Sequence, residues 1–327
     1  MVAPLSFLNL WEFDTVTSTG IKPDQLTLLM VKANEILLTT HFSASIVLYN
    51  TVTNQSICFT TQYGGEMKRL IFLVVVLMLT FALAGCKPVT NHLDDIKTAG
   101  KVVVGTSADY PPFEFVDEAG NMMGFDVELM NEIGKRMGVT VEWTDMPFDS
   151  LIASVQEEKL DMSIAAFNYD EDRDKTVDFS DAYYTSEDAF VVKEGFEGDL
   201  SVPENLANFK LGAQSGTTQE GWIIDNLITP GLMDENNFKS YERVDQAALD
   251  LDAGRFDVLM ADYVPAQAIV SQFGGMKIVY HGVLSTGPVN IVLREGDADL
   301  QAEVNRIIKE LQDEGFIDEL AKKYFSE

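Results

Sequence analysis

Residues Asp161–Ser180 read DMSIAAFNYDEDRDKTVDFS, and they join a short apolar run to an acid-rich turn that contains one arginine, Arg173. The apolar run, Met162–Phe167, is partly branched and bounded by charges, which is typical of a strand that helices bury on both faces. In open α/β sheets such strands end at a crevice, where a fixed guanidinium offers a planar fork that matches a carboxylate. The stretch therefore predicts an anion site at Arg173, with a solvated surface ion cluster as the alternative.

The composition bounds the class of protein. The 327 residues, 46% of them hydrophobic, suffice for one large or two medium domains with proper cores. The net charge of −29 argues against a nucleic-acid partner, because a phosphate backbone is bound through clustered lysines and arginines. The two cysteines, Cys58 and Cys86, both precede the globular part, so we expect no disulfide and no thiolate metal site in the domain.

An export signal is predicted to start at residue 67. Met67-Lys68-Arg69 is a basic start, Leu70–Ala84 is almost wholly apolar, and Leu83-Ala84-Gly85 brings small residues to Cys86. The apolar run is short for a spanning helix, which needs about 20 residues. The segment resembles a bacterial lipoprotein signal, which implies that Cys86 becomes the lipidated first residue of the mature protein. An uncleaved anchor helix is the alternative.

The residues on either side of this signal are interpreted from it. Residues 1–66 have few charges, no clear period and no motif. Because an export signal belongs at the amino terminus, we interpret 1–66 as a spurious upstream extension from a start codon assigned in error. Residues 87–95 are expected to form a short tether.

From Lys101 onward, strands and helices are expected to alternate. Asp126 is expected to cap a helix that Gly138 closes. The pattern predicts a βαβαβ unit, and then starts again, which indicates two α/β lobes of about 100 residues each. The expected strands are 102–105, 113–116, 139–143, 161–167, 190–192, 210–213, 256–260 and 290–293. The expected helices are 126–137, 149–158, 203–207 with Ser201 as cap, 220–227, 245–252, 263–272, 300–313 and 317–324.

Over about residues 95–327, the chain resembles the extracytoplasmic solute-binding proteins of polar amino acid ABC importers, bacterial solute-binding protein family 3. The matching motifs, in order, are VGTSADYPPFEF at 104–115, GFDV at 124–127, Asp161 with Arg173, VDFS at 177–180, GTT at 216–218, GRFD at 254–257 and KYF at 323–325. The resemblance implies a two-lobed, type II periplasmic-binding-protein fold, in which two mostly parallel sheets joined by two hinge strands enclose the ligand. Carried over, the first lobe is 96–188 plus 289–327, and the second is 189–288.

The resemblance also implies where the charged groups of an amino acid bind. It places the ligand α-carboxylate at Arg173, with further donors near Asn168 and at the helix start of Thr217 and Thr218. It places the α-ammonium at Asp262. From the residues alone, a Gly-containing helix start is a weak anion signal, and Asp262 serves equally well as the cap of the next helix.

The ligand side chain is assigned by resemblance to other positions. Tyr110 and Phe148 match the aromatic walls of the family, although each alone is typical of a core aromatic. Ser107, Gln214, Ala261 and Asp109 correspond to positions that tune selectivity. Ser107 and Gln214 favour a polar uncharged ligand such as glutamine, whereas Asp109 favours a cationic one such as arginine or lysine. Asn168 stands where the family usually has Ser or Thr, so we expect a differently hydrogen-bonded carboxylate clamp.

The expected partners are an amino acid, the permease subunits of an ABC importer, and the membrane through lipid on Cys86. We expect a monomer held outside the cytoplasm, without cofactor, metal or catalytic residues. Two alternatives are a ligand-sensing domain for signalling and an enzyme like cyclohexadienyl dehydratase. An enzyme needs a positioned acid and base, and the three histidines, His41, His92 and His281, match no such role.

Replacing Cys86 by serine is expected to release the protein from the membrane or leave it unprocessed. The reason is that each buried CH₂ of an acyl chain adds about 0.8 kcal/mol of membrane affinity. Membrane fractionation with mass spectrometry of the amino terminus measures this, and Cys58→Ser is the matched control that should change nothing. A native amino terminus at Met1 with unmodified Cys86 would overturn the interpretation.

Overall fold

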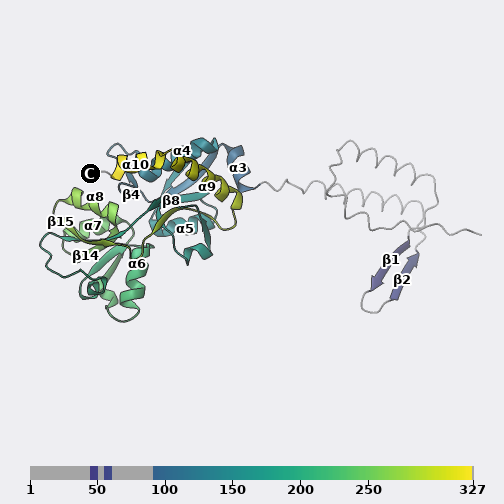
Figure 1. Ribbon diagram of the computed structural model, residues 1–327. Helices are drawn as coiled ribbons and strands as arrows, with labels where there is room; N and C mark the ends of the chain where they lie inside the picture. Colours follow the sequence, from purple (N-terminus) through teal and green to yellow (C-terminus); the bar gives the residue numbers. More distant parts are fainter. Residues whose placement is uncertain (1–44, 51–54, 61–90, 326–327) are drawn as a thin grey trace, which may run out of the picture. The chain divides into compact units, whose positions relative to one another are not determined.

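The computed structural model describes residues 45–50, 55–60 and 91–325, in two units, Met1–Lys87 and Pro88–Glu327, that are treated separately (Figure 1). In the first unit, β1 (Ser45–Asn50) and β2 (Gln55–Thr60) form an antiparallel hairpin in which Cys58 lies opposite Val47. The expected signal at 67–86, with Cys86, lies outside the described residues. Among the described residues, no helix is both long and apolar enough to cross a bilayer.

The first sheet of the second unit has the strand order β10-β16-β8-β3-β7, and β9 also pairs with β16. β3 runs parallel to β7 and β8, whereas β16 is antiparallel to its neighbours. All seven residues of β8 are buried, as expected for the apolar run in the opening stretch. The strands are β3 (Lys101–Thr106), β7 (Thr140–Asp145), β8 (Met162–Asn168), β9 (Val177–Phe179), β10 (Tyr184–Thr185) and β16 (Pro288–Arg294).

The second sheet has the order β13-β12-β14-β11-β15. β12 is parallel to β13 and β14, and β11 is antiparallel to β14 and β15. The strands are β11 (Asp188–Lys193), β12 (Leu211–Gln214), β13 (Phe238–Tyr241), β14 (Val258–Asp262) and β15 (Met276–Gly282). A third, small sheet consists of β4 (Asp109–Tyr110), β5 (Glu114–Val116) and β6 (Met122–Met123). The two main sheets are therefore mixed rather than mostly parallel.

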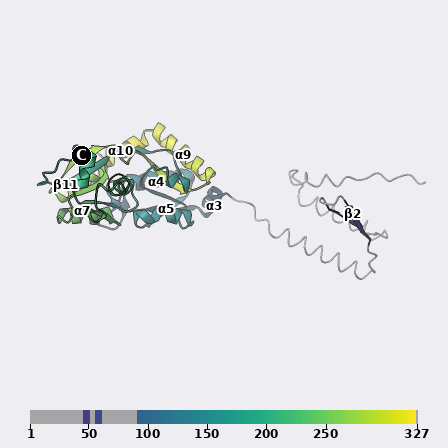
Figure 2. The ribbon, with the colours of Figure 1, turned by 90° about the horizontal axis from the view of Figure 1, so that it is seen from below.

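Helices cover both sheets (Figure 1, Figure 2). In the first lobe, α10 packs against α4 and α9, and α5 packs against β8 and β16. In the second, α7 packs against β12 and α8 against β15. The helices are α3 (His92–Ala99), α4 (Phe125–Met137), α5 (Phe148–Gln156), α6 (Thr218–Ile223), α7 (Val244–Asp252), α8 (Tyr263–Phe273), α9 (Ala298–Asp313) and α10 (Phe316–Phe325). Shorter helical segments are η3 (Arg173–Lys175), η4 (Pro203–Asn208), η5 (Ile224–Ile228) and η6 (Glu235–Asn237).

The chain passes between the sheets twice, just before β11 and just before β16. Asp188, at the start of β11, is fully buried. Its carboxylate accepts hydrogen bonds from Leu284, Ser285 and Thr286 at 2.8–3.2 Å, through main-chain N–H groups and two hydroxyls. One side chain thus ties the two crossing segments together.

Two capping expectations are wrong. Gly124, not Asp126, holds the N-cap position of α4, and the Asp126 side chain is buried inside the first turn. Ser201 does not cap η4, because Val202 occupies that position and its backbone is extended. His281 lies in β15, where its ring stacks on Tyr263.

The expected tether is too long by four residues, since α3 starts at His92. Asn91 caps this helix, because its side chain accepts from the N–H of Asp94 at 2.8 Å, and Gly100 closes it in the left-handed region with φ 68°. The helix packs against α9 and β3 of the first lobe.

His92 fixes α3 to the first lobe. Its Nε2 lies 2.8 Å from Oδ1 of Asp161, and its Nδ1 contacts Asp297. These hydrogen bonds, led by that of Asp161, raise the pKa of His92 above its ordinary 6.5, although burial opposes them. Burial alone raises the pKa of Asp161, but hydrogen bonds from His92 and Val103 reverse this and lower it.

Replacing His92 by glutamine is expected to cost about 1–2 kcal/mol of unfolding free energy at pH 5.5. A histidine whose pKa is raised on folding stabilises most below its unfolded pKa of 6.5, and loses that contribution as pH rises through the folded pKa. Urea unfolding at pH 5.5 and 8.5 measures the difference. His281→Gln is the control, because this exposed histidine makes an exposed pair with Glu187, and its replacement should cost little. An equal cost for His92→Gln at both pH values would contradict the pairing.

Candidate functional site

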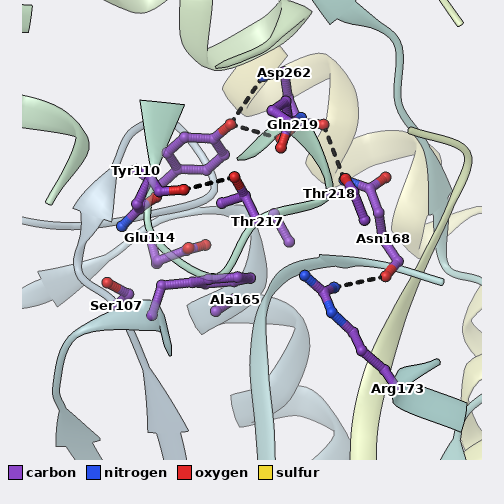
Figure 3. A pocket seen from close by; sticks show the side chains of 13 residues that line it. Ser107, Tyr110, Glu114, Ala165, Asn168, Arg173, Thr217, Thr218, Gln219 and Asp262 are labelled. Carbon is purple, nitrogen blue, oxygen red and sulfur yellow. Dashed lines mark hydrogen bonds between the residues drawn. The ribbon is translucent and has the colours of Figure 1, made fainter. Parts of the chain in front are cut away.

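A pocket lies between the two lobes, at the carboxyl ends of β8 and β14 (Figure 3). Its lining residues are Ser107, Tyr110, Glu114, Phe148, Ala165, Ala166, Asn168, Arg173, Gln214, Thr217, Thr218, Gln219 and Asp262. Nine of the eleven residues that the sequence analysis associates with a ligand are therefore brought together at one place. Their roles toward a ligand stay predictions.

Four lining residues were not expected there: Glu114, Ala165, Ala166 and Gln219. Ala261 and Asp109 do not line the pocket, although Asp109 lies next to it and accepts a hydrogen bond from Ser107 Oγ at 2.7 Å. One signal for Glu114 was available in the sequence. It is a charged residue between Phe113 and Phe115, where an acid buried with its aromatic neighbours would need a specific reason.

Arg173 enters the pocket from η3 of the first lobe. Its Nη1 donates to the carbonyl of Asn168 at 3.0 Å, and its Nη2 donates to the carbonyl of Gly216 in the second lobe at 2.6 Å. The guanidinium carbon lies 5.7 Å from the ring centre of Phe148 and 5.9 Å from that of Phe167. Two of its five donors are used by these carbonyls, so the fork is held in place while N–H groups remain for an anion.

Asp262 enters the pocket from the end of β14 in the second lobe. It occupies the N-cap position of α8, but its side chain makes no capping hydrogen bond to that helix. The alternative role as a side-chain cap is therefore not observed. Its carboxylate accepts from the hydroxyls of Tyr110 and Ser186, both at 2.6 Å, and from Asn168 Nδ2 at 3.2 Å. Burial raises the pKa of Asp262, and these hydrogen bonds oppose the shift.

The start of α6 forms one wall. Thr217 is its N-cap, since Thr217 Oγ1 accepts from the N–H of Glu220 at 3.2 Å and donates to the carbonyl of Gln214 at 2.7 Å. Among the described residues, three buried polar atoms that line the pocket have no hydrogen-bond partner: Thr218 Oγ1, Gln219 Nε2 and Glu114 Oε2. An unsatisfied buried group typically costs about 1–3 kcal/mol, so a ligand with polar groups would relieve this cost.

The lobes also touch directly beside the pocket. Arg243 of the second lobe makes a two-pronged pair with Asp145 of the first, with both N···O distances at 3.0 Å. The N–H of Val244, at the start of α7, donates to Asp109 of the first lobe at 2.6 Å. Ser215 Oγ donates to Asp149 at 3.0 Å, near Gly216.

Gly216 is required for this approach. Its φ is 76°, and a Cβ there would lie 2.9 Å from the Cα of Asp149 on α5. A side chain at 216 would therefore hold the lobes apart as well as strain the turn.

Comparisons with known proteins match the part of the chain that forms the two lobes. A sequence model of the bacterial extracellular solute-binding proteins, family 3, matches residues 102–327. The arginine-binding extracellular protein ArtP of Bacillus subtilis is 30% identical over 264 residues, 80% of this chain and 99% of that protein. The L-cystine-binding protein TcyJ of Escherichia coli is 30% identical over 233 residues, 71% of this chain and 85% of that protein.

Two solved structures extend this likeness. The substrate binding protein of an amino acid ABC transporter is 34% identical, with a TM-score of 0.63, and the match covers 70% of this chain and 100% of that one. The ancestral amino acid-binding protein AncCDT-1, a precursor of cyclohexadienyl dehydratase, is 30% identical, with a TM-score of 0.65 and coverage of 72% and 100%.

Replacing Arg243 by alanine is expected to shift the protein toward an open form and to weaken ligand binding by up to about fivefold. The paired Asp145 is partly exposed, so losing this contact between the lobes should cost under about 1 kcal/mol. Small-angle scattering without ligand should show a larger radius of gyration than that of the wild type. Arg255→Ala, which removes a pair within the second lobe, is the control. An unchanged radius for Arg243→Ala would indicate that this pair does not hold the lobes together.

Proposed function

Because the chain belongs to the bacterial extracellular solute-binding proteins of family 3, we propose that its pocket holds an α-amino acid between Arg173 and Asp262. The chain is the substrate-binding component of an amino acid ABC transporter. One observation carries the proposal for the site: a partly buried guanidinium from one lobe and a buried carboxylate from the other line the same pocket. A zwitterion supplies the opposite charge to each.

The α-carboxylate is assigned to Arg173. Burial lowers the pKa of this arginine, because its charge is removed from water, and an incoming carboxylate would restore the lost solvation. The hydroxyl of Thr218 lines the same pocket and is one of the unpartnered atoms, so it is suited to add a donor to that anion.

The α-ammonium is assigned to Asp262. Its carboxylate already accepts from three donors, two at Oδ1 and one at Oδ2, so Oδ2 keeps acceptor capacity for an ammonium. A cation there would lower the pKa that burial raises. Asn168 serves here mainly through its side chain, which bridges Asp262 and the N–H of Gly287 at 3.2 Å each.

The ligand side chain is assigned to the remaining walls. Tyr110 and Phe148 offer aromatic surface, and Ser107 and Gln214 offer neutral polar groups. In Figure 3, Ser107 and Glu114 lie on one side of the pocket and Arg173 on the other. A thermal-shift screen against the twenty amino acids would identify the ligand, because selective binding raises the unfolding midpoint by mass action.

Closure of the two lobes is proposed to trap the ligand. Arg173 and Asp262 come from different lobes, so a zwitterion that contacts both favours the closed form. Small-angle scattering at ligand saturation would test this. A radius of gyration unchanged from that of the free protein would argue for a rigid domain.

Further parts of the role are proposed from the family and the sequence. The closed protein would deliver its ligand to permease subunits from outside the cytoplasm, held as a monomer by lipid on Cys86. We propose no enzymatic turnover. His92 and His281, the two histidines within the described residues, both lie outside the pocket lining. Turnover of prephenate or arogenate by the purified protein would overturn this.

Replacing Arg173 by alanine is expected to weaken ligand binding by roughly 30-fold to a few thousand-fold. Breaking one side of a desolvated ion pair typically costs about 2–5 kcal/mol, at about 1.4 kcal/mol per tenfold change. Arg173→Lys should fail nearly as badly, because an ammonium lacks the two-pronged geometry. Asp262→Asn should also weaken binding. Titration calorimetry with the amino acid found in the screen measures all three.

Lys175→Ala is the matched control for Arg173. Lys175 lies in the same short helix, but it is exposed and its Nζ pairs with the exposed Asp172. It should bind like the wild type. Wild-type affinity in Arg173→Ala would show instead that the arginine belongs to a surface ion cluster.

A further inference from the structure

Two carboxyl groups are buried side by side behind the pocket. Glu114 on β5 is 1% exposed and lines the pocket, and Asp126 on α4 is fully buried. Their side chains are within hydrogen-bonding reach of each other. Asp126 Oδ2 also accepts from the N–H of Ala166 at 2.7 Å and from the hydroxyl of Tyr183 at 2.9 Å. Oε2 of Glu114 and Oδ1 of Asp126 are both buried and have no other hydrogen-bond partner.

The groups that face this pair are neutral or acidic. Tyr183 comes from the segment before β10, Asp109 from β4, and Asp262 from the end of β14. Tyr110 on β4 also feels the charge of Glu114. The nearby cations are engaged elsewhere: Arg173 lies across the pocket in Figure 3, and Arg243 reaches Asp109 at 3.4 Å.

Two adjacent buried carboxyl groups without a paired cation cannot both ionise easily. Burial raises the pKa of Asp126 to about 7. Burial and the charge of Asp126 raise the pKa of Glu114 well above its ordinary value, so near neutrality the pair keeps at least one proton. A protonated carboxyl group donates to its ionised neighbour, which satisfies one oxygen of each.

We propose that a cationic ligand side chain binds at the carboxyl group of Glu114 and displaces a proton from the Glu114–Asp126 pair. The proton leaves to solvent as the cation enters, so the charge of the pocket is conserved. A cation favours the ionised pair, and binding therefore strengthens as pH rises toward neutrality. A neutral side chain does not displace the proton. This inference rests on the proposed amino acid site, and it makes the choice between cationic and neutral ligands depend on pH.

Arginine and glutamine are the two probes. Both carry the same α-groups between pH 5.5 and 7.5, so any titration of Asp262 affects them equally. Titration calorimetry in two buffers with different heats of ionisation counts the protons released. Arginine should release up to one proton more than glutamine does. Its Kd should fall by up to tenfold per pH unit relative to that of glutamine between pH 5.5 and 7.5.

Glu114→Gln removes the titrating group with little change in shape. It should weaken arginine binding and abolish the extra proton release, with folding confirmed by thermal unfolding. Glu118→Gln, an exposed glutamate four residues along the same segment, is the control and should keep the difference between the ligands.

The wild-type measurements test the inference even if Glu114→Gln fails to fold. Equal pH dependence and equal proton release for arginine and glutamine would overturn the inference while leaving the amino acid site standing. Binding of glutamine without binding of arginine would also overturn the inference and leave the amino acid site standing. If neither ligand bound and the screen of twenty amino acids found no other, both the site and the inference would fall.

Discussion

The pocket depends on the hydrogen bonds that protein groups, in place of water, donate to the buried carboxylate of Asp262. Three donors from the first lobe and from a crossing segment, Tyr110, Asn168 and Ser186, take the place of a counter-cation. A buried carboxylate tolerates burial only with such donors or with a paired charge. Two of the three donors belong to the other lobe, so the solvation of Asp262 is tied to the relative position of the lobes. When the lobes open, water replaces these protein donors around Asp262. A ligand ammonium joins the donors only while the lobes are closed.

A second buried carboxylate lies directly opposite in the sheet. In the register of β11 and β14, Asp188 pairs with Asp262, and like charges facing each other across strands are normally destabilising. The arrangement persists because Asp188 is held by N–H and hydroxyl donors from residues 284–286. The charge of Asp188 still contributes to the raised pKa of Asp262. The base of the cleft thus carries surplus negative charge, which a ligand ammonium would relieve.

Local patterns predicted the parts of this structure that are set by neighbours in sequence. The buried strand β8, the turn with Arg173 and the helix that begins at Thr218 follow from apolar runs, charges and a glycine. Asp126 was placed wrongly because a helix start offers an acid a plausible local role, whereas its true partners, Ala166 and Tyr183, are 40 and 57 residues away. β13 and β15 were missed because charged and polar residues interrupt their apolar patterns. Contacts between lobes leave no such pattern in either segment alone.

The choice between a polar uncharged and a cationic ligand could not be made from the residues, and the pocket suggests a physical reason. Ser107 and Gln214 are neutral hydrogen-bonding groups at any ordinary pH. Glu114 has two forms: protonated, it offers a donor and an acceptor much as an amide does, and ionised, it offers a negative charge. Which form prevails depends on Asp126, and therefore on burial and on the proton concentration. On this view, the identity of the lining residues leaves the ligand class open because selectivity depends on a protonation state that the sequence does not display.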